Sequence, residues 1–333
     1  MSPTLKQIAR ETGVAISTVS RALNGHPHVD EQTRRRVQEA ADRLGYRPSV
    51  AARALRGSGT RTVGVVLPDM MNHFYARTVS VLQDQLEERG FGVVLTVTAN
   101  DGRREREALD RLGSRQVDGI IIVPTIMRLP PSPDGVPIIE LNRQTSRAVD
   151  KVGYDEAAGS QALVDHLVAQ GHTQIAYIGG EGGFTTTRNR IAGFRTALEA
   201  ANIDAQQDWF LLASHTRAWG AEATRRILDA PAPDRPTAVF AASSEIALGF
   251  LTAARHRGLR LPDDLSLVAF GDPDWYEVVT PSITCYDQPI AQCASIAVQL
   301  LANRMAGTVS DQLAKVIVEG RVVLRESVAA PTP

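Results

Sequence analysis

The apolar positions at the start of the chain recur at intervals of three and four residues, which is the period of an amphipathic helix. Thr4 and Gln7 have the spacing of a capping box, and Gly13 can adopt the left-handed turn that ends a helix. We therefore predict a short helix over residues 4–11. Its apolar face consists of Leu5, Ile8 and Ala9.

A second helix is predicted over residues 13–24, directly after that turn. Val19, Ala22 and Leu23 are spaced to share one buried face. The opposite face carries small polar and basic side chains, which are typical of a helix that enters a DNA major groove. Two short helices joined by a tight glycine turn form a helix-turn-helix, so this end of the chain is predicted to bind DNA. The outward side chains are Ile16, Ser17, Ser20 and Arg21.

A third helix is predicted from Asp30 to Leu44, and it closes a three-helix core. Three consecutive arginines lie on or near its outer side. They are either solvated surface charges or contacts to DNA phosphates, which position a protein without reading sequence. The inner face consists of Thr33, Val37, Ala40 and Leu44, and the arginines are Arg34, Arg35 and Arg36.

Residues 47–57 form an alanine-rich segment with the start and stop signals of a two-turn helix, Pro48 and Gly57. Two turns are too few for a stable helix in water, and the apolar side chains have no local partner. Two interpretations remain. The segment is a linker, or it is a hinge that becomes helical when paired with a second copy on DNA, with Leu55 between base steps of the minor groove.

From Arg61 onward, apolar runs of strand length alternate with amphipathic helices. This βαβ rhythm predicts parallel sheets flanked by helices. The rhythm restarts after residue 141, so we predict two similar lobes with a crevice at the carboxyl ends of their strands, where open α/β sheets bind ligands. Strands are predicted at 62–67, 91–97, 117–123, 137–141, 175–178, 209–213, 238–242, 266–270 and near 315–318, and helices at 74–89, 103–115, 157–170, 190–201, 219–229, 246–257 and 290–305.

Charge is distributed unevenly along the 333 residues. Residues 1–61 contain 11 Lys and Arg against 5 Asp and Glu, whereas the remainder contains 25 against 32. A basic front end on an acidic body suits contact with phosphates at one end only. Cys285 and Cys293 have no metal-ligand spacing, and no apolar run has the length of a signal region or a membrane span. We expect reduced thiols in a cytoplasm and no membrane attachment.

Residues 4–55 resemble the DNA-binding head and hinge of the LacI/GalR family of bacterial transcription regulators. The shared motifs, in the same order and spacing, are T-L-K-Q-I-A-R-E-T-G-V, T-V-S-R-A-L-N-G, L-G-Y-R-P and A-A-R-A-L. The body resembles the effector domain of the same family, which is related in fold to periplasmic sugar-binding proteins. The matching segments of the body are V-G-V-V-L-P-D, G-H-T-Q-I-A-Y-I-G-G, R-I-A-G-F-R-T-A-L and L-P-D-D-L-S-L-V-A-F. The resemblance therefore covers nearly the entire chain.

This resemblance implies an α/β protein with a three-helix helix-turn-helix head, a hinge helix, and a two-lobed body like a type I periplasmic binding protein. The domains are then a DNA-binding domain at 1–46, a hinge and linker at 47–60, and an effector-binding and dimerisation domain at 61–333. Its N-lobe is expected at about 61–155 plus 289–314, and its C-lobe at about 156–288 plus 315–328.

The resemblance also implies a transcriptional regulator, expected to be a repressor, that binds a near-palindromic double-stranded operator as a homodimer. One departure concerns Ala15, which stands where the family usually has Ser. Alanine cannot cap the reading helix, and the loss of a cap costs about 1 kcal/mol. The implied DNA-binding residues are Thr4, Ala15, Ile16, Ser17, Thr18, Ser20, Arg21, Asn24, Tyr46, Val50, Ala51, Leu55 and Arg56.

A small-molecule effector is implied in the crevice. Arg190 occupies the R-x-x-G-F position whose arginine holds effector hydroxyls in sugar-responsive members, and its forked donors suit vicinal hydroxyls or a carboxylate. The alternative is an arginine that pairs with a nearby acid. Asp272 is likewise open to interpretation as a helix cap. The implied effector residues are Asp69, His73, Phe74, Asn142, Arg190, His215, Ser243, Gly271 and Asp272.

Several of these positions depart from the family pattern. Asn142, Ser243 and Gly271 stand where relatives place an Asp, an Asn and an Asp, so acceptor-bearing groups are lost. His73 and His215 replace a proline and an aromatic residue, and either could join the arginine. We therefore hypothesise that the effector is an anionic or modified sugar in preference to a neutral hexose.

Enzyme motifs are absent from the sequence. Residues 179–183 are glycine-rich and follow a strand, but they lack the G-x-G-x-x-G spacing. There is no nucleophile elbow, Walker lysine loop or H-E-x-x-H helix, and the seven histidines form no ligand cluster. We expect no catalysis, no cofactor and no metal.

Three other classes of protein were weighed against a regulator. A transport-type binding protein is disfavoured by the head and by the lack of a signal region. A sugar-active enzyme with an added head is disfavoured by the lack of catalytic motifs, and an architectural DNA binder by the two-lobed body. The chain ends in a short Ala/Pro tail without a heptad helix, so a dimer is expected rather than a tetramer.

Overall fold

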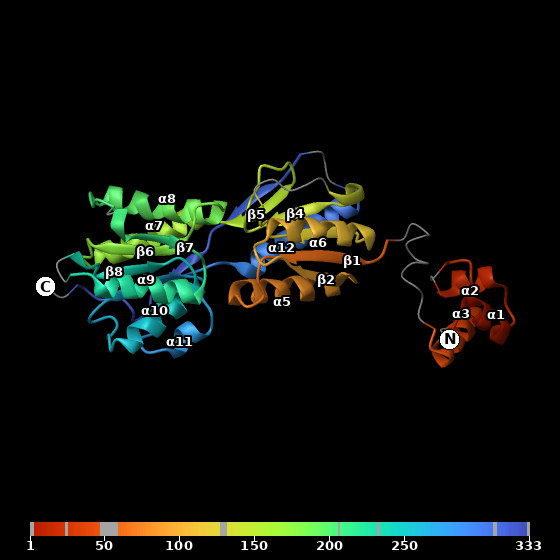
Figure 1. Ribbon diagram of the computed structural model, residues 1–333. Helices are drawn as coiled ribbons and strands as arrows, with labels where there is room; N and C mark the ends of the chain where they lie inside the picture. The colour runs from red at the N-terminus through yellow and green to blue at the C-terminus, as the bar shows by residue number, and fades with distance from the viewer. Residues whose placement is uncertain are drawn as a thin grey trace. The chain divides into compact units, whose positions relative to one another are not determined.

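The structure is a computed structural model of the full chain. It describes residues 3–23, 26–46, 59–126, 132–205, 207–231, 234–308 and 312–331. The chain divides into two compact units between Thr60 and Arg61, and each unit is considered by itself (Figure 1). In the described residues, no helix is both long and apolar enough to cross a membrane.

The first unit contains the three predicted helices, α1 (Leu5–Thr12), α2 (Ile16–Leu23) and α3 (Glu31–Leu44). The backbone N–H of Thr4 donates to Oε1 of Gln7 at 2.7 Å, and Gly13 ends α1 in the left-handed conformation with φ of 69°. Both features confirm the predicted start and stop of the first helix. The buried core of this unit is Ile8, Val19, Ala22, Val29, Val37, Ala40 and Ala41.

The body contains two six-stranded sheets, each covered by helices on both faces, so the predicted α/β architecture is confirmed. The strand order is β11-β5-β4-β3-β1-β2 in the first sheet and β12-β10-β9-β8-β6-β7 in the second. The first lobe is built from β1 (Thr62–Leu67), α5 (His73–Glu88), β2 (Gly92–Val97), α6 (Gly102–Ser114), β3 (Gly119–Ile122), η1 (Pro133–Gly135), β4 (Ile138–Leu141), β5 (Asp150–Tyr154), α12 (Ile290–Met305) and β11 (Lys315–Val318).

The second lobe contains the middle of the chain and one late strand. All strand pairs in the body are parallel except β10 with β12. The elements of this lobe are α7 (Glu156–Ala169), β6 (Ile175–Gly180), α8 (Thr185–Ala200), η2 (Gln207–Trp209), β7 (Phe210–Ala213), α9 (Arg217–Asp229), β8 (Ala238–Ala241), α10 (Ser244–His256), β9 (Ser266–Phe270), α11 (Trp275–Val278), β10 (Thr284–Asp287) and β12 (Arg321–Val323).

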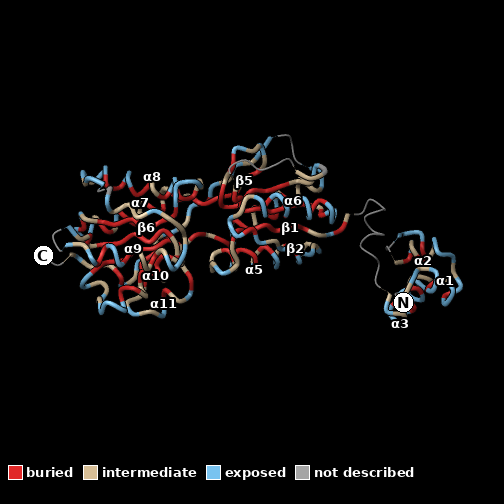
Figure 2. Tube along the Cα trace, in the orientation of Figure 1, coloured by how far each residue is buried: buried red, intermediate tan, exposed pale blue. Residues whose placement is uncertain are grey.

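The strands alternate their side chains between two cores in the first lobe. Val63 and Val65 pack against α5 and α12, whereas Val66 packs against α6 on the other face. Figure 2 shows buried residues concentrated along the strands and the inner helix faces. A strand buried on both faces reads as a continuous apolar run, which is why β1 was predicted with its observed bounds.

One lobe boundary differs from the prediction. Residues 315–328 were expected in the C-lobe, but β11 pairs in parallel with β5 and belongs to the first sheet. Only β12 crosses to the second sheet, where it pairs with β10. The chain therefore passes between the lobes three times, after β5, after β10 and after β11.

Candidate functional site

The outer face of α2 is the candidate DNA-reading surface. Val19 and Ala22 are buried in the core of the first unit, which turns Ile16, Ser17 and Arg21 outward. Ile16 is 44% exposed. The exposed face therefore combines one apolar, one hydroxyl and one cationic side chain. Thr18 and Ser20 on the same helix are half-buried.

The other predicted DNA-binding residues lie in different surroundings. Thr4 and Ala15 are exposed, and the carbonyl of Ala15 accepts the N–H of Val19 at 3.0 Å. Tyr46 is half-buried and packs against the core of the first unit. Five predicted residues fall outside the described residues, namely Asn24, Val50, Ala51, Leu55 and Arg56, and so does the predicted hinge helix.

The three arginines of α3 differ from one another. Arg34 donates Nη2 to the backbone carbonyls of His26 (3.0 Å) and Val29 (3.2 Å), so it holds the α2–α3 loop. Arg35 and Arg36 are exposed. Arg34 fits neither of the two interpretations left open, because its guanidinium group holds this loop, whereas Arg35 and Arg36 keep both.

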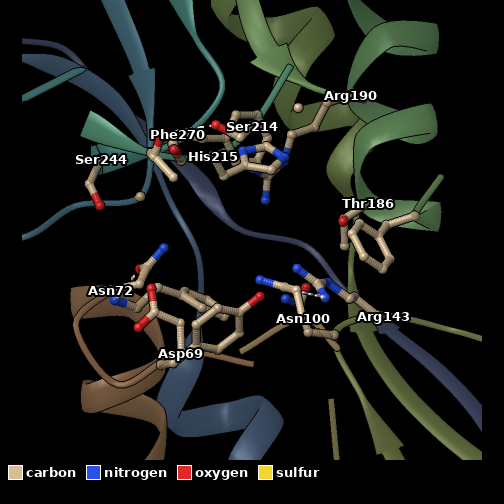
Figure 3. Close-up of a pocket in the computed structure, with 18 of the residues that line it drawn as sticks. Asp69, Asn72, Asn100, Arg143, Thr186, Arg190, Ser214, His215, Ser244 and Phe270 are labelled. Atoms are coloured by element: carbon tan, nitrogen blue, oxygen red, sulfur yellow. Dashed lines mark hydrogen bonds between the residues drawn. The ribbon is translucent and has the colours of Figure 1, made fainter. Parts of the chain in front are cut away.

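The body has a cavity of about 430 Å³ between its lobes (Figure 3). It is lined from the segments that follow the carboxyl ends of seven strands, β1, β2, β4, β6, β7, β8 and β9, with Gln288 from the β10–α12 crossing. This is the position at which open α/β sheets bind ligands. The lining residues are Asp69, Asn72, Phe74, Tyr75, Asn100, Asn142, Arg143, Gly180, Glu181, Gly183, Phe184, Thr186, Arg190, Ala213, Ser214, His215, Thr216, Ser243, Ser244, Phe270, Gly271 and Gln288.

The cavity brings together seven of the nine predicted effector residues: Asp69, Phe74, Asn142, Arg190, His215, Ser243 and Gly271. His73 and Asp272 instead line a small cavity of about 20 Å³ that adjoins the first and shares Phe74, Ser244, Gly271 and Gln288 with it. Both carboxylate oxygens of Asp272 accept N–H groups of Arg325, at 2.8 and 2.9 Å. The carboxylate of Asp272 is therefore engaged in an ion pair and does not cap a helix.

Arg190 pairs with a nearby acid, which is one of the two interpretations of this residue. Its Nε donates to the buried carboxylate of Glu156, and its Nη1 donates to the carbonyl of Ala242. The guanidinium carbon lies 4.1 Å from the centroid of the Phe270 ring. Within the described part of the chain, Nη2 has no hydrogen-bond partner, so its two N–H groups are available to a ligand.

His215 is uncharged at neutral pH. Burial, together with the positive charges of Arg190 and Arg143, lowers the pKa of His215 to about 3. Its Nε2 lies 3.2 Å from the hydroxyl oxygen of Thr187 on α8. His215 therefore offers a ligand a neutral imidazole and not a second cation, contrary to the supplementary cationic role considered for it.

Arg143 was missed by the sequence reasoning and is the second arginine of the cavity. It is 7% exposed, and its Nη1 donates to Oδ1 of Asn100 at 2.8 Å. The guanidinium carbon lies 3.7 Å from the centroid of the Phe184 ring, which belongs to the opposite lobe. Beside it, the backbone N–H of Gln144 donates to the hydroxyl of Thr185 at 3.0 Å. Arg143 is thus fixed from both lobes.

Several lining groups have unused hydrogen-bonding capacity. Oδ1 of Asn142 is buried without a partner among the described residues. Oδ1 of Asp69 accepts the N–H of Met71 at 2.8 Å, and Oδ1 of Asn72 caps α5 by accepting the N–H of Phe74 at 3.0 Å. The second oxygen of Asp69 and the amide N–H groups of Asn72 remain for a ligand. Buried polar groups are normally satisfied, so the unpaired Oδ1 of Asn142 supports this cavity as the candidate binding site.

A common signal links the lining residues that were missed. Asn100 and Arg143 lie within three residues of the carboxyl end of a strand, as Asn142 does. The rule that ligands bind beyond the carboxyl ends of parallel strands would have found them. Phe184 and Thr186 lie at the start of α8, which was predicted to begin five residues too late. The described residues hold no cluster of three His, Cys, Asp or Glu that could hold a metal ion.

Comparisons with known proteins agree with this arrangement. Residues 4–49 match the bacterial regulatory proteins of the lacI family, and residues 164–328 match a periplasmic binding protein-like domain. Catabolite control protein A of Priestia megaterium is 30% identical over 313 residues, which cover 92% of this chain and 93% of that protein. The chain therefore belongs to the lacI family of bacterial regulatory proteins, which are transcriptional regulators and not enzymes.

Two solved structures are similar over almost the whole chain. The lac repressor dimer bound to operator and the anti-inducer ONPF has a TM-score of 0.86 at 25% identity, covering 99% of this chain and 100% of that chain. A complex of the transcriptional regulator CelR with cellobiose has a TM-score of 0.73 at 30% identity, covering 98% and 100%. These similarities extend through both units of the chain.

Proposed function

We propose that the protein is a repressor that binds a near-palindromic operator as a homodimer, and that a sugar or sugar derivative in the cavity changes its affinity for DNA. The observation that supports this most directly is the pairing of two features in one chain. An exposed, partly cationic helix face lies in a helix-turn-helix, and a polar cavity is lined from both lobes of the body. The domain boundaries at 46/47 and 60/61 are part of this proposal.

On DNA, the outer face of α2 reads base edges in the major groove, and the thirteen predicted DNA-binding residues supply the contacts. A single small head buries too little surface for useful specificity. A twofold dimer presents two reading helices to successive major grooves, and residues 47–58 of the two chains reach the minor groove between them. The protein acts at the nucleoid in the cytoplasm, where its operator is found.

In the body, the nine predicted effector residues contact or flank the ligand, with Asn72, Asn100 and Arg143 added by the structure. Amides, hydroxyls, two arginines, two carboxylates (Asp69 and Glu181) and four aromatic rings surround the cavity. Such a lining suits a hydroxyl-rich ring, which presents polar edges and apolar faces. The complex of the similar regulator CelR with cellobiose supports a sugar as the ligand here.

The ligand acts by contacting both lobes at once. If the lobes have two arrangements, the ligand shifts the equilibrium toward the one that it binds more tightly. The size of this shift equals the difference between the binding free energies of the ligand for the two arrangements. Residues 47–58 connect the head to the first strand of the N-lobe, so the same shift alters how the paired hinges meet DNA. Couplings of this kind are worth about 1–3 kcal/mol.

Selection of DNA fragments from a random pool tests the DNA-binding half of the proposal. We expect the recovered sites to share two inverted half-sites at a fixed spacing. Arg21→Ala should weaken binding to the selected site, whereas Arg103→Gln should not, because Arg103 is an exposed arginine of α6 in the body. Recovery of unrelated sequences, with equal affinity for all of them at physiological salt, would show that the protein is not a sequence-specific regulator.

A further inference from the structure

We infer that the ligand of the interlobe cavity is a sugar acid whose carboxylate binds between Arg143 of the N-lobe and Arg190 of the C-lobe. This inference rests on the proposed function and narrows its ligand class. Figure 3 shows the two arginines on opposite walls of the cavity. Both are 7% exposed, so a carboxylate between them would be shielded from water.

The two guanidinium groups are held in fixed orientations. Arg143 stacks on Phe184 at 3.7 Å, and Arg190 stacks on Phe270 at 4.1 Å. Each guanidinium also donates hydrogen bonds to the protein. Nη1 of Arg143 donates to Asn100, and Nε and Nη1 of Arg190 donate to Glu156 and Ala242. Planar donors fixed in this way suit bidentate carboxylate recognition, because little side-chain freedom remains to be lost on binding.

Unused donors outnumber acceptors at this end of the cavity. Nη2 and Nε of Arg143 and Nη2 of Arg190 have no hydrogen-bond partner among the described residues, and the amide nitrogen of Asn100 is equally unused. A ligand group that accepts several hydrogen bonds and carries negative charge satisfies them all. A hydroxyl accepts fewer hydrogen bonds and has no charge to offset that of a guanidinium.

The charge of Arg143 is not neutralised by an ion pair. The salt bridges of the described residues include one between Arg190 and Glu156 but none to Arg143. Glu105 lies close enough for Arg143 to lower its pKa, against the larger effect of burial, which raises it. The carboxylate of Glu105 is occupied by the backbone N–H groups of Thr125 and Ile126. Burial lowers the pKa of His215, and the positive charges of Arg190 and Arg143 lower it further.

The rest of the cavity favours hydroxyl groups. Asp69 lies away from the two arginines in Figure 3, and one of its carboxylate oxygens is unused. The amide of Asn72 adds donors there, and Ser243 and Ser244 add hydroxyl groups nearby. A carboxylate oxygen accepts hydrogen bonds from vicinal hydroxyls but would repel a second acid. The ligand therefore carries one acidic group at the arginine end and hydroxyls at the other.

Titration calorimetry on the full-length protein with D-galacturonate, its methyl ester and D-galactose tests this inference. D-Glucuronate and D-gluconate, each compared with D-glucose, extend the series. The ester keeps the shape of the acid but removes its charge. We expect at least one acid to bind about tenfold or more tightly than its neutral counterpart, as charge-assisted hydrogen bonds allow. A neutral sugar or ester that binds as tightly as every acid overturns the inference, and so does the absence of binding by all the acids.

Variants of Arg143 test whether the arginine pair causes the preference for an acid over its neutral ester. Arg143→Gln should reduce the ratio of acid affinity to ester affinity to about one, and Arg143→Lys, which keeps the charge without the planar fork, should retain part of it. Asp69→Asn should weaken binding of acid and ester by similar factors and leave their ratio in place. Arg103→Gln removes an exposed arginine from the same lobe and should change neither affinity. An unchanged ratio in both Arg143 variants overturns the inference.

Failure of this inference is distinguishable from failure of the proposed function. If a neutral sugar binds and changes operator affinity, the sugar-acid inference is wrong and the proposed function stands. The effector part of the proposed function fails only if operator affinity is unchanged by neutral and acidic sugars alike.

Discussion

At the scale of single residues, Arg190 stabilises the C-lobe and, in the proposed function, also binds the ligand. Its Nε and Nη1 hold Glu156 and the end of β8, and its Nη2 is left for the cavity. Burial raises the pKa of Glu156, although the adjacent guanidinium opposes that effect. The ion pair therefore places the arginine at a defined position in the ligand site.

Removal of Arg190 should affect both properties. We expect Arg190→Met to lower the free energy of unfolding by about 3–5 kcal/mol, because Glu156 stays buried without its partner. Urea denaturation measures this change. The double variant Arg190→Met/Glu156→Leu should regain most of the stability but not ligand binding. A double variant as unstable as the single one would show that the buried charge is not the cause.

His215 should make stability depend on pH. The unfolded chain binds a proton on this residue near pH 6.5, whereas the folded site takes it up only near pH 3. The unfolded state therefore holds more protons between these values, and the free energy of unfolding falls as pH falls below about 6.5. For one such group the slope reaches at most about 1.4 kcal/mol per pH unit.

Denaturation curves between pH 6.5 and 5 measure this dependence above the range in which most carboxylates titrate. We expect His215→Gln to flatten the slope. His256→Gln, at an exposed position, should leave it unchanged. A residual slope is expected in both variants, because burial also lowers the pKa of His172. Equal slopes in the wild type and His215→Gln would contradict the assignment.

At the scale of elements, most helices and strands were predictable from periodicity alone. The strands buried on both faces, such as β1 and β9, are apolar runs with sharp limits, and their predicted bounds match the observed ones. Three short strands were not predicted: β5, β10 and β12. Each of these strands is only three to five residues long and contains a charged residue. Their conformation is therefore decided by pairing with neighbouring strands, and not by the local pattern of apolar residues.

The chemistry of the site was less predictable than the fold. Positions aligned with a family motif, such as Arg190, were located from the sequence. Arg143 was not, because its place in the cavity depends on the loop after β4 and on Phe184 of the other lobe. Asn142, at the start of that loop, has a positive φ of 65°. Loop conformation of this kind is set by tertiary contacts and leaves little trace in periodicity.

The close contact between α7 and α8 requires a glycine, Gly193, at the point where the helices meet. A Cβ on Gly193 would lie 2.0 Å from the carbonyl oxygen of Ala157, so the two helices approach too closely for alanine. We expect Gly193→Ala to lower the free energy of unfolding by about 1–3 kcal/mol, as overpacking does. Because α8 carries Arg190, ligand affinity should fall as well.

Thermal denaturation and ligand titration of Gly193→Ala measure these two effects. Gly182→Ala is the matched control, because a Cβ on Gly182 meets nothing within 4 Å among the described residues and its φ is not positive. The control should retain wild-type stability. Wild-type stability in Gly193→Ala itself would show that the two helices can separate without penalty.

At the scale of the whole body, the two lobes are connected by three chain crossings and by contacts at the edge of the cavity. Arg143 on Phe184 and the Gln144–Thr185 hydrogen bond join the lobes directly. A ligand that binds between Arg143 and Arg190 adds a further bridge at the same place. In the proposed function, ligand occupancy and lobe arrangement are therefore linked through a small group of side chains.

The central claim is that the cavity controls how tightly the helix-turn-helix holds DNA. Its most direct test is the affinity for the selected operator, measured with and without a saturating amount of the tightest-binding sugar or sugar acid. The ligand affinity is measured in parallel, with and without operator. Linkage requires the same factor in both directions, and we expect about 5–150-fold. Identical operator affinity in the presence and absence of a ligand shown to occupy the cavity would contradict the claim.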